Sequence, residues 1–285
     1  MKVLVLGGTG TVGRQVVERL LPLAEEVRVA TRSLDRLAHL PDGVAGVLAD
    51  LTRPETLPDA VSGADAVCLI TALGPTEADE GVAAVEAVRT SGVRRCVYMS
   101  VVQPPGAERI PHFASKAPIE RALARAGVEH TVIRPNCFMQ NDLWYLDTML
   151  KHGVYPQPIG ARGVSMVDVR DIADAIVSAL VRGGVDGRTV SLHGPEALTG
   201  ERVAATWSRH LGREVAPVVD DVDGWARQAG ATLPPWMVDD LVVMWRFFQE
   251  HGLAASAAEL AAQEELVGHP PRRHADFVAE AAAGR

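Results

Sequence analysis

Residues 3–13 have the sequence VLVLGGTGTVG, in which an apolar run passes directly into a glycine-rich turn. The run at residues 3–6 is short, continuous and rich in valine and leucine, which predicts a buried strand. Residues 11–21 follow with apolar side chains at helical spacing. A strand, a glycine turn and a helix in this order predict the first unit of a dinucleotide-binding sheet. A glycine turn without a ligand is the alternative.

The three glycines at three-residue spacing have separate roles in this prediction. Gly7 permits the tight turn, Gly10 lets the backbone approach a pyrophosphate, and Gly13 lets the helix pack closely on the strand. The amino end of the helix presents N–H groups and a positive dipole end to the phosphates. We therefore expect cofactor contacts from Gly7, Gly10 and the intervening and following residues Thr9, Thr11 and Val12.

Strand and helix patterns alternate after this turn as far as residue 133. Strands are expected at residues 27–30, 43–48, 66–70, 96–99 and 131–133, and helices at residues 78–91 and 119–126. Continuous apolar strands separated by helices are typical of a parallel sheet covered on both faces. The expected fold class is α/β, a Rossmann-like doubly wound parallel sheet.

The second half of the chain has a different character. All five tryptophans and four of the five phenylalanines follow residue 136, and prolines and glycines interrupt residues 153–163. Helices are expected at residues 168–180 and 199–211, a strand at 188–192, and mostly helix from residue 220 onward. We predict a NADP-binding Rossmann domain at residues 1–152. A smaller, mostly helical substrate-binding region follows at residues 153–285, with some elements returning to the sheet.

Composition and charge exclude several classes of protein. The 285 residues carry 28 Lys and Arg against 36 Asp and Glu, a net charge of −8, which argues against a nucleic-acid partner. No apolar run approaches the roughly 18 residues of a membrane span, and the amino terminus does not have the pattern of a signal peptide. The scattered Cys68, Cys96 and Cys137 predict inert thiols in a reducing cytoplasm, and no metal site is expected.

The end of the second strand decides between the two nicotinamide cofactors. An NAD site normally has Asp or Glu there, to bind the ribose 2′-hydroxyl. This strand ends instead at Thr31-Arg32, and a guanidinium pairs well with a 2′-phosphate. Arg14 and Arg36 lie close enough in sequence to assist. The residues favour NADP(H) over NAD(H), with a solvated surface arginine as the alternative for Arg32.

Two further strand ends are expected to face the cofactor. Asp50-Leu51 ends the third strand, whose edge lies beside the adenine in this fold, although a helix or turn cap is an alternative role for Asp50. Thr71, Ala72 and Leu73 follow the fourth strand. The carboxyl ends of the strands line the crevice of an open α/β sheet, so this loop should lie at the cofactor.

Candidate catalytic residues follow the fifth strand. Ser100 ends that strand, and His112 and Lys116 are four residues apart, on one face of a segment that is helical. Pro118 leaves a second arrangement open, in which the helix begins near the proline and Lys116 lies in a bend. Lys116 is a candidate to bind ribose hydroxyls, with an exposed helix lysine as the alternative.

As an ordered set, the motifs resemble the NmrA-like family, an atypical branch of the short-chain dehydrogenases/reductases. The matching stretches are GGTGTVG at 7–13, TRS at 31–33, DL at 50–51, KAPIE at 116–120, TVIRPN at 131–136, FMQN at 138–141, VDVRDIA at 167–173, HGPEALT at 193–199, GHPPR at 268–272 and DFV at 276–278. The resemblance implies an NADP-binding Rossmann domain with a small carboxy-terminal substrate region. Family members include NADPH-dependent reductases of quinones and triphenylmethane dyes, and redox sensors that bind dinucleotide without turnover.

The resemblance also implies roles for particular residues. Lys116 matches the family's lysine near the nicotinamide ribose, and residues 134–136 (Arg134, Pro135 and Asn136) would pass beside the nicotinamide. Phe138 and Met139 would enter the substrate pocket. Other short-chain dehydrogenases/reductases carry a catalytic tyrosine four residues before the lysine. That position holds a histidine here, a proton donor or a surface residue.

The aromatic second half predicts an apolar pocket for a flat, conjugated substrate, with Trp144 and Trp236 among its candidate residues. Ordinary helix packing is the alternative. The first hypothesis is an NADPH-dependent reductase, acting as a monomer or homodimer. It would transfer a hydride to a small conjugated acceptor such as a quinone, imine, enone or dye. A non-catalytic NADP-sensing regulator is the second hypothesis.

Overall fold

The computed structural model describes residues 1–182, 184–218 and 220–284. The chain forms two compact units, each packed within itself. Unit 1 consists of Met1–Val102, His112–Arg134 and Val169–Ser191, and unit 2 of Gln103–Pro111, Pro135–Asp168 and the described part of Leu192–Arg285. These units reflect internal packing and do not identify a cofactor-binding or a substrate-binding part, so the domain boundary expected after residue 152 stays a prediction.

Unit 1 is built on a seven-stranded sheet of order β3-β2-β1-β4-β5-β6-β8. The strands are β1 (Lys2–Leu6), β2 (Glu26–Thr31), β3 (Val44–Leu48), β4 (Ala66–Ile70), β5 (Arg95–Met99), β6 (Glu129–Pro135) and β8 (Thr189–Leu192). Neighbouring strands from β3 to β6 pair in parallel. The chain moves outward from β1 in one direction to β3 and then in the other to β8, so the order reverses between β1 and β4. This is the doubly wound α/β fold that the sequence predicts, and the reversal marks its ligand-binding crevice.

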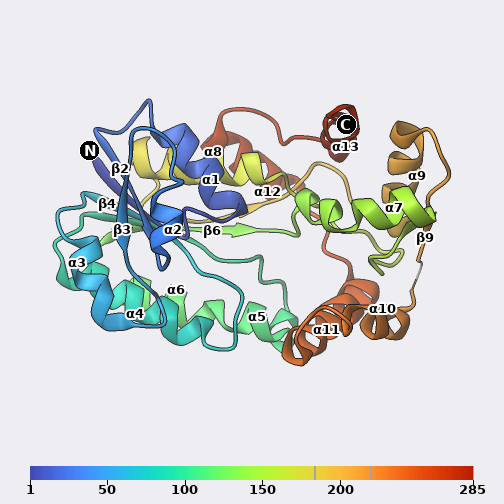
Figure 1. Ribbon diagram of the computed structural model, residues 1–285, viewed down its shortest axis with the longest axis horizontal. Coiled ribbons are helices and arrows are strands. Elements are labelled where there is room, and N and C mark those ends of the chain that lie inside the picture. Colours follow the sequence, from blue (N-terminus) through green and yellow to red (C-terminus); the bar gives the residue numbers. More distant parts are fainter. Residues whose placement is uncertain (183, 219, 285) are drawn as a thin grey trace. The chain divides into compact units, whose positions relative to one another are not determined.

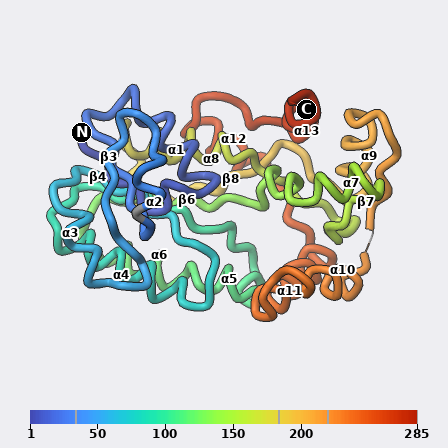
Figure 2. The backbone as a smooth tube through the Cα atoms, in the orientation of Figure 1, coloured from blue at the N-terminus to red at the C-terminus, as the bar shows by residue number. Residues whose placement is uncertain are grey.

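Helices cover both faces of this sheet. Figure 1 shows α1 (Thr11–Leu20) and α8 (Val169–Arg182) on one side, and α3 (Leu57–Val61), α4 (Glu77–Thr90) and α6 (Lys116–Arg125) on the other. The tube in Figure 2 shows that α8 lies beside α1, although about half the chain separates them. Helix α1 buries Val12, Val16 and Leu20, and this spacing of apolar residues makes one face of a helix.

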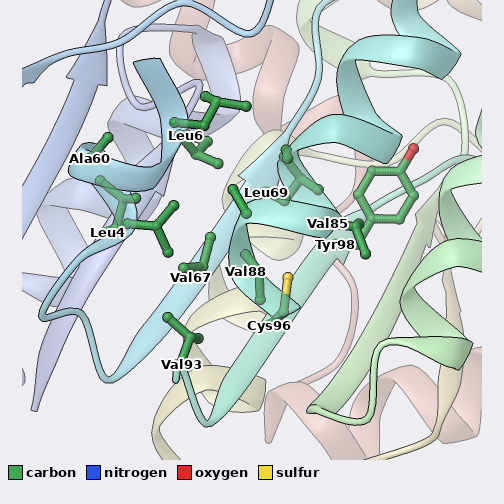
Figure 3. Close-up of a cluster of buried hydrophobic side chains, with 14 of the residues drawn as sticks. Leu4, Leu6, Ala60, Val67, Leu69, Val85, Val88, Val93, Cys96 and Tyr98 are labelled. Carbon is green, nitrogen blue, oxygen red and sulfur yellow. The ribbon is translucent and has the colours of Figure 1, made fainter. Parts of the chain in front are cut away.

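The core of unit 1 explains why its strands are continuous apolar runs. Figure 3 shows alternate residues on one face of three neighbouring strands: Leu4 and Leu6 of β1, Val67 and Leu69 of β4, and Cys96 and Tyr98 of β5. Val85 and Val88 of α4 pack against them. Val3 and Val5 of β1 are also buried, so both faces of the sheet are covered. Burial of each valine or leucine contributes about 1.5–3 kcal/mol, which holds the strand ends that carry the site.

Unit 2 is mostly helical, as expected. Its elements are η3 (Met139–Tyr145), α7 (Leu146–His152), α9 (Gly200–Leu211), α10 (Val222–Ala229), α11 (Pro235–His251), α12 (Ala257–Val267), α13 (His274–Ala283) and a small parallel pair of β7 (Val154–Tyr155) and β9 (Ala216–Pro217). Two further short helices are η1 (Pro54–Thr56) and α2 (Leu34–Leu37) in unit 1, and η2 (Ala107–Arg109) belongs to unit 2. Within the described ranges, no helix has both the length and the apolar character needed to cross a bilayer.

A single buried carboxylate joins several elements of unit 2. Asp142 of η3 is fully buried, and its Oδ1 accepts hydrogen bonds from Tyr155 Oη at 2.9 Å and Gln157 Nε2 at 3.0 Å. Its Oδ2 accepts from Trp207 Nε1 at 2.9 Å and lies 2.8 Å from Nε2 of His274. A buried charge is tolerated when hydrogen bonds satisfy it, so this cluster ties η3, β7, α9 and α13 together.

Candidate functional site

Two glycines of the first turn are required by the fold itself. Gly7 has a φ of +83°, and a Cβ there would lie 2.5 Å from the carbonyl oxygen of Ile70. A Cβ on Gly13 would lie 2.2 Å from the carbonyl oxygen of Gly7. Both positions therefore exclude a side chain on steric grounds, with or without a ligand.

Gly10 is different, because nothing in the protein forbids a side chain there. It is exposed, its φ is −80°, and a Cβ would meet only the Gly7 carbonyl oxygen at 3.4 Å. Gly10 is also the N-cap of α1, and no side chain caps that end of the helix. Thr11 is exposed and the side chain of Val12 is buried, and the cofactor contacts expected of both residues stay predictions. The first-turn N–H groups of a helix form an anion site.

Two of the three arginines of the sequence pattern contact this turn. Arg36 Nη1 donates to Thr9 Oγ1 at 3.3 Å, and Arg14 Nε donates to the Thr9 carbonyl oxygen at 3.0 Å. Arg32 is exposed just after β2, and its charge acts on Asp50. Two guanidinium groups therefore contact the glycine turn, and a third follows the end of the neighbouring strand β2.

Asp50 takes the turn-capping role named as its alternative. Its Oδ1 accepts from the backbone N of Thr52 at 3.0 Å and from Thr52 Oγ1 at 2.9 Å. Partial burial raises its pKa, but the hydrogen bonds from Thr52 and the charges of Arg32 and Arg53 outweigh burial and leave the pKa lowered. The adjoining Leu51 is half-buried. Contact of either residue with an adenine stays a prediction.

The loop after β4 has one buried and two exposed residues. Ala72 and Leu73 are exposed, whereas Thr71 is buried and donates from Oγ1 to Glu77 Oε1 at 2.7 Å. Lys116 Nζ in turn donates to Thr71 Oγ1 at 3.1 Å. The structure therefore brings two predicted site residues, Thr71 and Lys116, into direct contact at the carboxyl end of β4.

Lys116 is not the exposed lysine of the alternative prediction. It is 7% exposed and forms an ion pair with Glu77, which is fully buried at the first position of α4. Ser115 Oγ donates to the second carboxylate oxygen of Glu77 at 2.8 Å. Burial raises the pKa of Tyr98 on β5, and the negative charge of Glu77 adds to that increase. Glu77 was missed from sequence because it is one of three acidic residues in the first turn of α4.

The helix that carries Lys116 begins at the lysine and not near Pro118. Pro118 is the third residue of α6, where a backbone N–H has no partner within the helix, so the proline is tolerated. Of the two arrangements that the sequence left open, the one with a helix start near Pro118 and Lys116 in a bend before it is not observed. His112 lies in the preceding short helix α5 (Pro111–Ala114), is half-buried, and meets the Phe113 ring edge-on with centroids 4.8 Å apart.

Ser100 belongs to a second polar cluster, one turn further along α6. Its Oγ donates to Glu120 Oε1 at 2.5 Å. Arg134 at the end of β6 donates to both oxygens of Glu120, from Nε at 3.0 Å and from Nη2 at 2.5 Å. Glu120 is four residues after Lys116, so α6 directs both clusters from one face toward the ends of β4, β5 and β6.

Pro135 and Asn136 are buried in unit 2, and the carboxamide of Asn136 is committed to structure. Its Nδ2 lies 3.0 Å from His193 Nδ1 and donates to the Leu253 carbonyl oxygen at 2.9 Å. Its Oδ1 accepts from the backbone N of Cys137 at 2.7 Å. Because an amide nitrogen only donates, Nδ1 of His193 is the acceptor. The predicted nicotinamide contact of Asn136 has no direct support in these bonds and stays a prediction.

The four predicted substrate residues differ in exposure. Met139 is fully buried and Trp144 is 75% exposed. Phe138 and Trp236 are half-buried, and Trp236 follows Pro235, the first residue of α11. Met139 packs within unit 2, where its Cε would lie 3.1 Å from a Cβ placed on Gly194. Their roles toward a substrate stay predictions.

The family of this chain follows from a comparison of its whole sequence. A model of the NmrA-like family matches residues 1–270. The chain belongs to the NmrA-like family.

Two relatives that align with nearly the full length of this NmrA-like chain are named as reductases. Over 281 residues it is 35% identical to the (4-alkanoyl-5-oxo-2,5-dihydrofuran-3-yl)methyl phosphate reductase of Streptomyces griseus, covering 98% of this chain and 97% of the relative. It is 32% identical over 289 residues to the NAD(P)H azoreductase of Xenophilus azovorans, covering 99% and 98%.

Solved structures share the fold of this NmrA-like protein. The NADPH-dependent quinone oxidoreductase of Escherichia coli, in complex with NADPH, aligns with a TM-score of 0.85 at 22% identity and covers 98% of this chain and 99% of that chain. The triphenylmethane reductase of Citrobacter sp. aligns with a TM-score of 0.86 at 18% identity, covering 99% and 100%. At this identity the likeness confirms the fold that the sequence predicts.

Proposed function

We propose that this NmrA-like protein is an NADPH-dependent reductase that transfers a hydride to a small, conjugated organic acceptor. The observation that carries the cofactor assignment is an arginine in place of a carboxylate after β2, with two further arginines at the glycine turn. Arg14 and Arg36 bond to Thr9, and Arg32 extends from the end of β2, where an NAD site would place a carboxylate. A guanidinium at that position suits the 2′-phosphate of NADPH.

The acceptor class follows from what the full-length relatives have in common. One is named for an alkanoyl-oxo-dihydrofuran and the other for azo compounds. Both substrates hold a π-bond conjugated to electron-withdrawing groups or aromatic rings. Such bonds accept a hydride because the electron pair spreads over neighbouring atoms, so a strong protein acid is less necessary. This suits a chain with His112 where related enzymes carry the catalytic tyrosine.

The chain's own residues would bind and orient the reactants. NADPH, when bound, supplies the hydride. The first-turn N–H groups of α1 would hold its pyrophosphate. Lys116 would bind the hydroxyls of the nicotinamide ribose, and the loop Thr71–Leu73 would line that side of the cofactor. We further propose that Ser100 and His112 lie near the acceptor, and that Phe138, Met139, Trp144 and Trp236 contact it. The free thiols Cys68, Cys96 and Cys137 support a reducing, cytoplasmic compartment.

The test is NADPH binding and oxidation by the purified protein, with NADH as the control cofactor. The acceptor panel contains a quinone, an azo dye, a triphenylmethane dye and an α,β-unsaturated lactone. We expect tighter binding of NADPH than of NADH and turnover of at least one acceptor. Tight NADPH binding without turnover across the panel would favour a regulator that senses NADP. Failure to bind either cofactor would contradict both functions.

Arg32→Ala tests the 2′-phosphate assignment directly. Loss of a charge-assisted hydrogen bond should weaken NADPH binding about 10-fold or more and leave NADH binding nearly unchanged. Fluorescence titration of each cofactor measures both affinities. Arg89→Ala is the matched control, because Arg89 is an exposed arginine of α4 that pairs with Glu86. An equal loss for NADPH and NADH would place Arg32 away from the 2′-phosphate.

A further inference from the structure

Glu77 is the least accessible charged group beside the proposed cofactor site. It is fully buried at the first position of α4, and the cofactor contacts proposed above do not include it. Its carboxylate receives the Lys116 ammonium, Thr71 Oγ1 at 2.7 Å and Ser115 Oγ at 2.8 Å. The amino end of α4 adds a favourable dipole. A buried carboxylate is retained only when such partners replace its lost hydration.

We propose that Glu77 is a positioning residue, which fixes the Lys116 ammonium at the carboxyl end of β4 so that it meets the cofactor in one place. This inference rests on the proposed function, in which Lys116 binds the nicotinamide ribose. Glu77 itself touches the lysine and two hydroxyl side chains, and acts through Lys116.

The geometry shows how the ammonium is held. The Nζ of Lys116 donates to both Glu77 Oε1 and Thr71 Oγ1, and Thr71 donates its own proton to the same Glu77 oxygen. This closed arrangement joins three elements of unit 1: the end of β4, the start of α4 and the start of α6. An ammonium has three donors and a flexible stem, so two fixed acceptors define the direction of the third.

Among the residues that the structure describes, Glu77 is the carboxylate that pairs with Lys116. Glu120, four residues along α6, is engaged by Arg134 and Ser100. Each carboxylate therefore pairs with a different cation: Glu77 with Lys116, and Glu120 with Arg134. Replacement of Glu77 by glutamine would remove the charge that pairs with the ammonium and turn one of the two acceptor oxygens into a donor, so Lys116 would be held less firmly in one place.

The test is a double-mutant cycle of Glu77→Gln and Lys116→Met, measured on NADPH affinity and on kcat and KM with a responsive acceptor. We expect Glu77→Gln to weaken NADPH binding about 10-fold, because small displacements of a binding group are costly. In the Lys116→Met background, Glu77→Gln should change neither affinity nor kcat/KM. The double variant carries a neutral pair of similar size, so it should fold even if one single variant does not.

Glu86→Gln is the matched control, since Glu86 is on the same helix in an exposed ion pair with Arg89. It should behave like the wild type. An equal effect of Glu77→Gln with and without Lys116 would overturn the proposal, as would unchanged NADPH binding in Glu77→Gln or in Lys116→Met. Wild-type protein that binds no NADPH would instead refute the proposed function, so the two failures are distinguishable.

Discussion

Asp142 shows how much of unit 2 depends on one side chain. Four donors from different segments converge on its two oxygens, and the carboxylate is fully buried. Asp142→Asn keeps the size of the side chain but replaces one acceptor oxygen with an NH₂ donor. At least one of the four donors would then lose its acceptor. We expect a loss of about 2–5 kcal/mol in the free energy of unfolding.

Thermal or denaturant unfolding followed by tryptophan fluorescence measures this loss, since Trp207 is one of the four donors. Asp147→Asn is the control, because Asp147 is exposed on α7 and pairs with Lys151 four residues later. Exposed ion pairs of this kind contribute little to the free energy of unfolding. Equal stability of the two variants would show that the Asp142 cluster does not hold unit 2 together.

Sequence indicated some of the site residues and could not have indicated others. Lys116 was recognised by its motif, but its partner Glu77 lies among Glu77, Asp79 and Glu80, all in the first turn of α4. A carboxylate in that position usually serves the helix dipole in solvent. Only the packing of α4 against α6 makes one of the three a buried counter-ion. The same holds for Glu120, which the family motif contained without a role.

At the scale of the element, two glycines of the first turn have different roles: Gly13 is required by the fold, and Gly10 is expected to be required by the ligand. A Cβ on Gly13 would collide with backbone atoms, which cannot move aside, whereas a Cβ on Gly10 would have room. We expect Gly13→Ala to destabilise the protein by about 2–4 kcal/mol or more. Gly10→Ala should unfold at nearly the wild-type temperature and bind NADPH about 10-fold more weakly, because its methyl group would face the pyrophosphate in the site proposed above.

Each variant is the control for the other, with thermal unfolding and NADPH titration as the two measurements. Wild-type NADPH affinity in Gly10→Ala would mean that the cofactor does not pass over this turn. Wild-type stability in Gly13→Ala would mean that β1 and α1 can move apart without a loss in the free energy of unfolding.

Elements with a clear period were predictable, and short ones were not. The strands of unit 1 have apolar runs that identify them, and β4 lies at the predicted residues 66–70. β7 and β9 have two residues each and pair across about 60 residues of chain, so no local pattern marks them. The start of α6 was misplaced because a proline suggests a helix start, although it is also tolerated at the third position.

At the scale of the whole molecule, acid should destabilise the protein through His193. Burial lowers the pKa of His193 below its ordinary value of 6.5, and the nearby Glu259 opposes this only in part. The unfolded chain therefore binds a proton at a higher pH than the folded one. The stability contributed by the neutral histidine is present above about pH 6.5 and is lost as the pH falls through the lower folded value.

We expect the melting temperature of the wild type to fall between pH 7.5 and pH 5.5, and His193→Gln to fall less. Glutamine keeps an acceptor for the Asn136 carboxamide and does not titrate. The pKa values of Asp50 and Glu259 are lowered from their ordinary values of 3.8 and 4.5, so these carboxylates affect stability only below this window. An identical pH dependence in wild type and variant would exclude His193 as the cause.

The discontinuity of unit 1 has a consequence for the order of events during synthesis. Its first two stretches end at Arg134, but α8 and most of β8 lie in a third stretch that ends at Ser191. While the ribosome is still making residues 135–168, the apolar face of α1 lacks α8 and β6 is an open edge. Until α8 emerges, the uncovered apolar face and the open strand edge are sites where growing chains can aggregate. The last strand, β8, can join the sheet only after about two thirds of the protein has been translated.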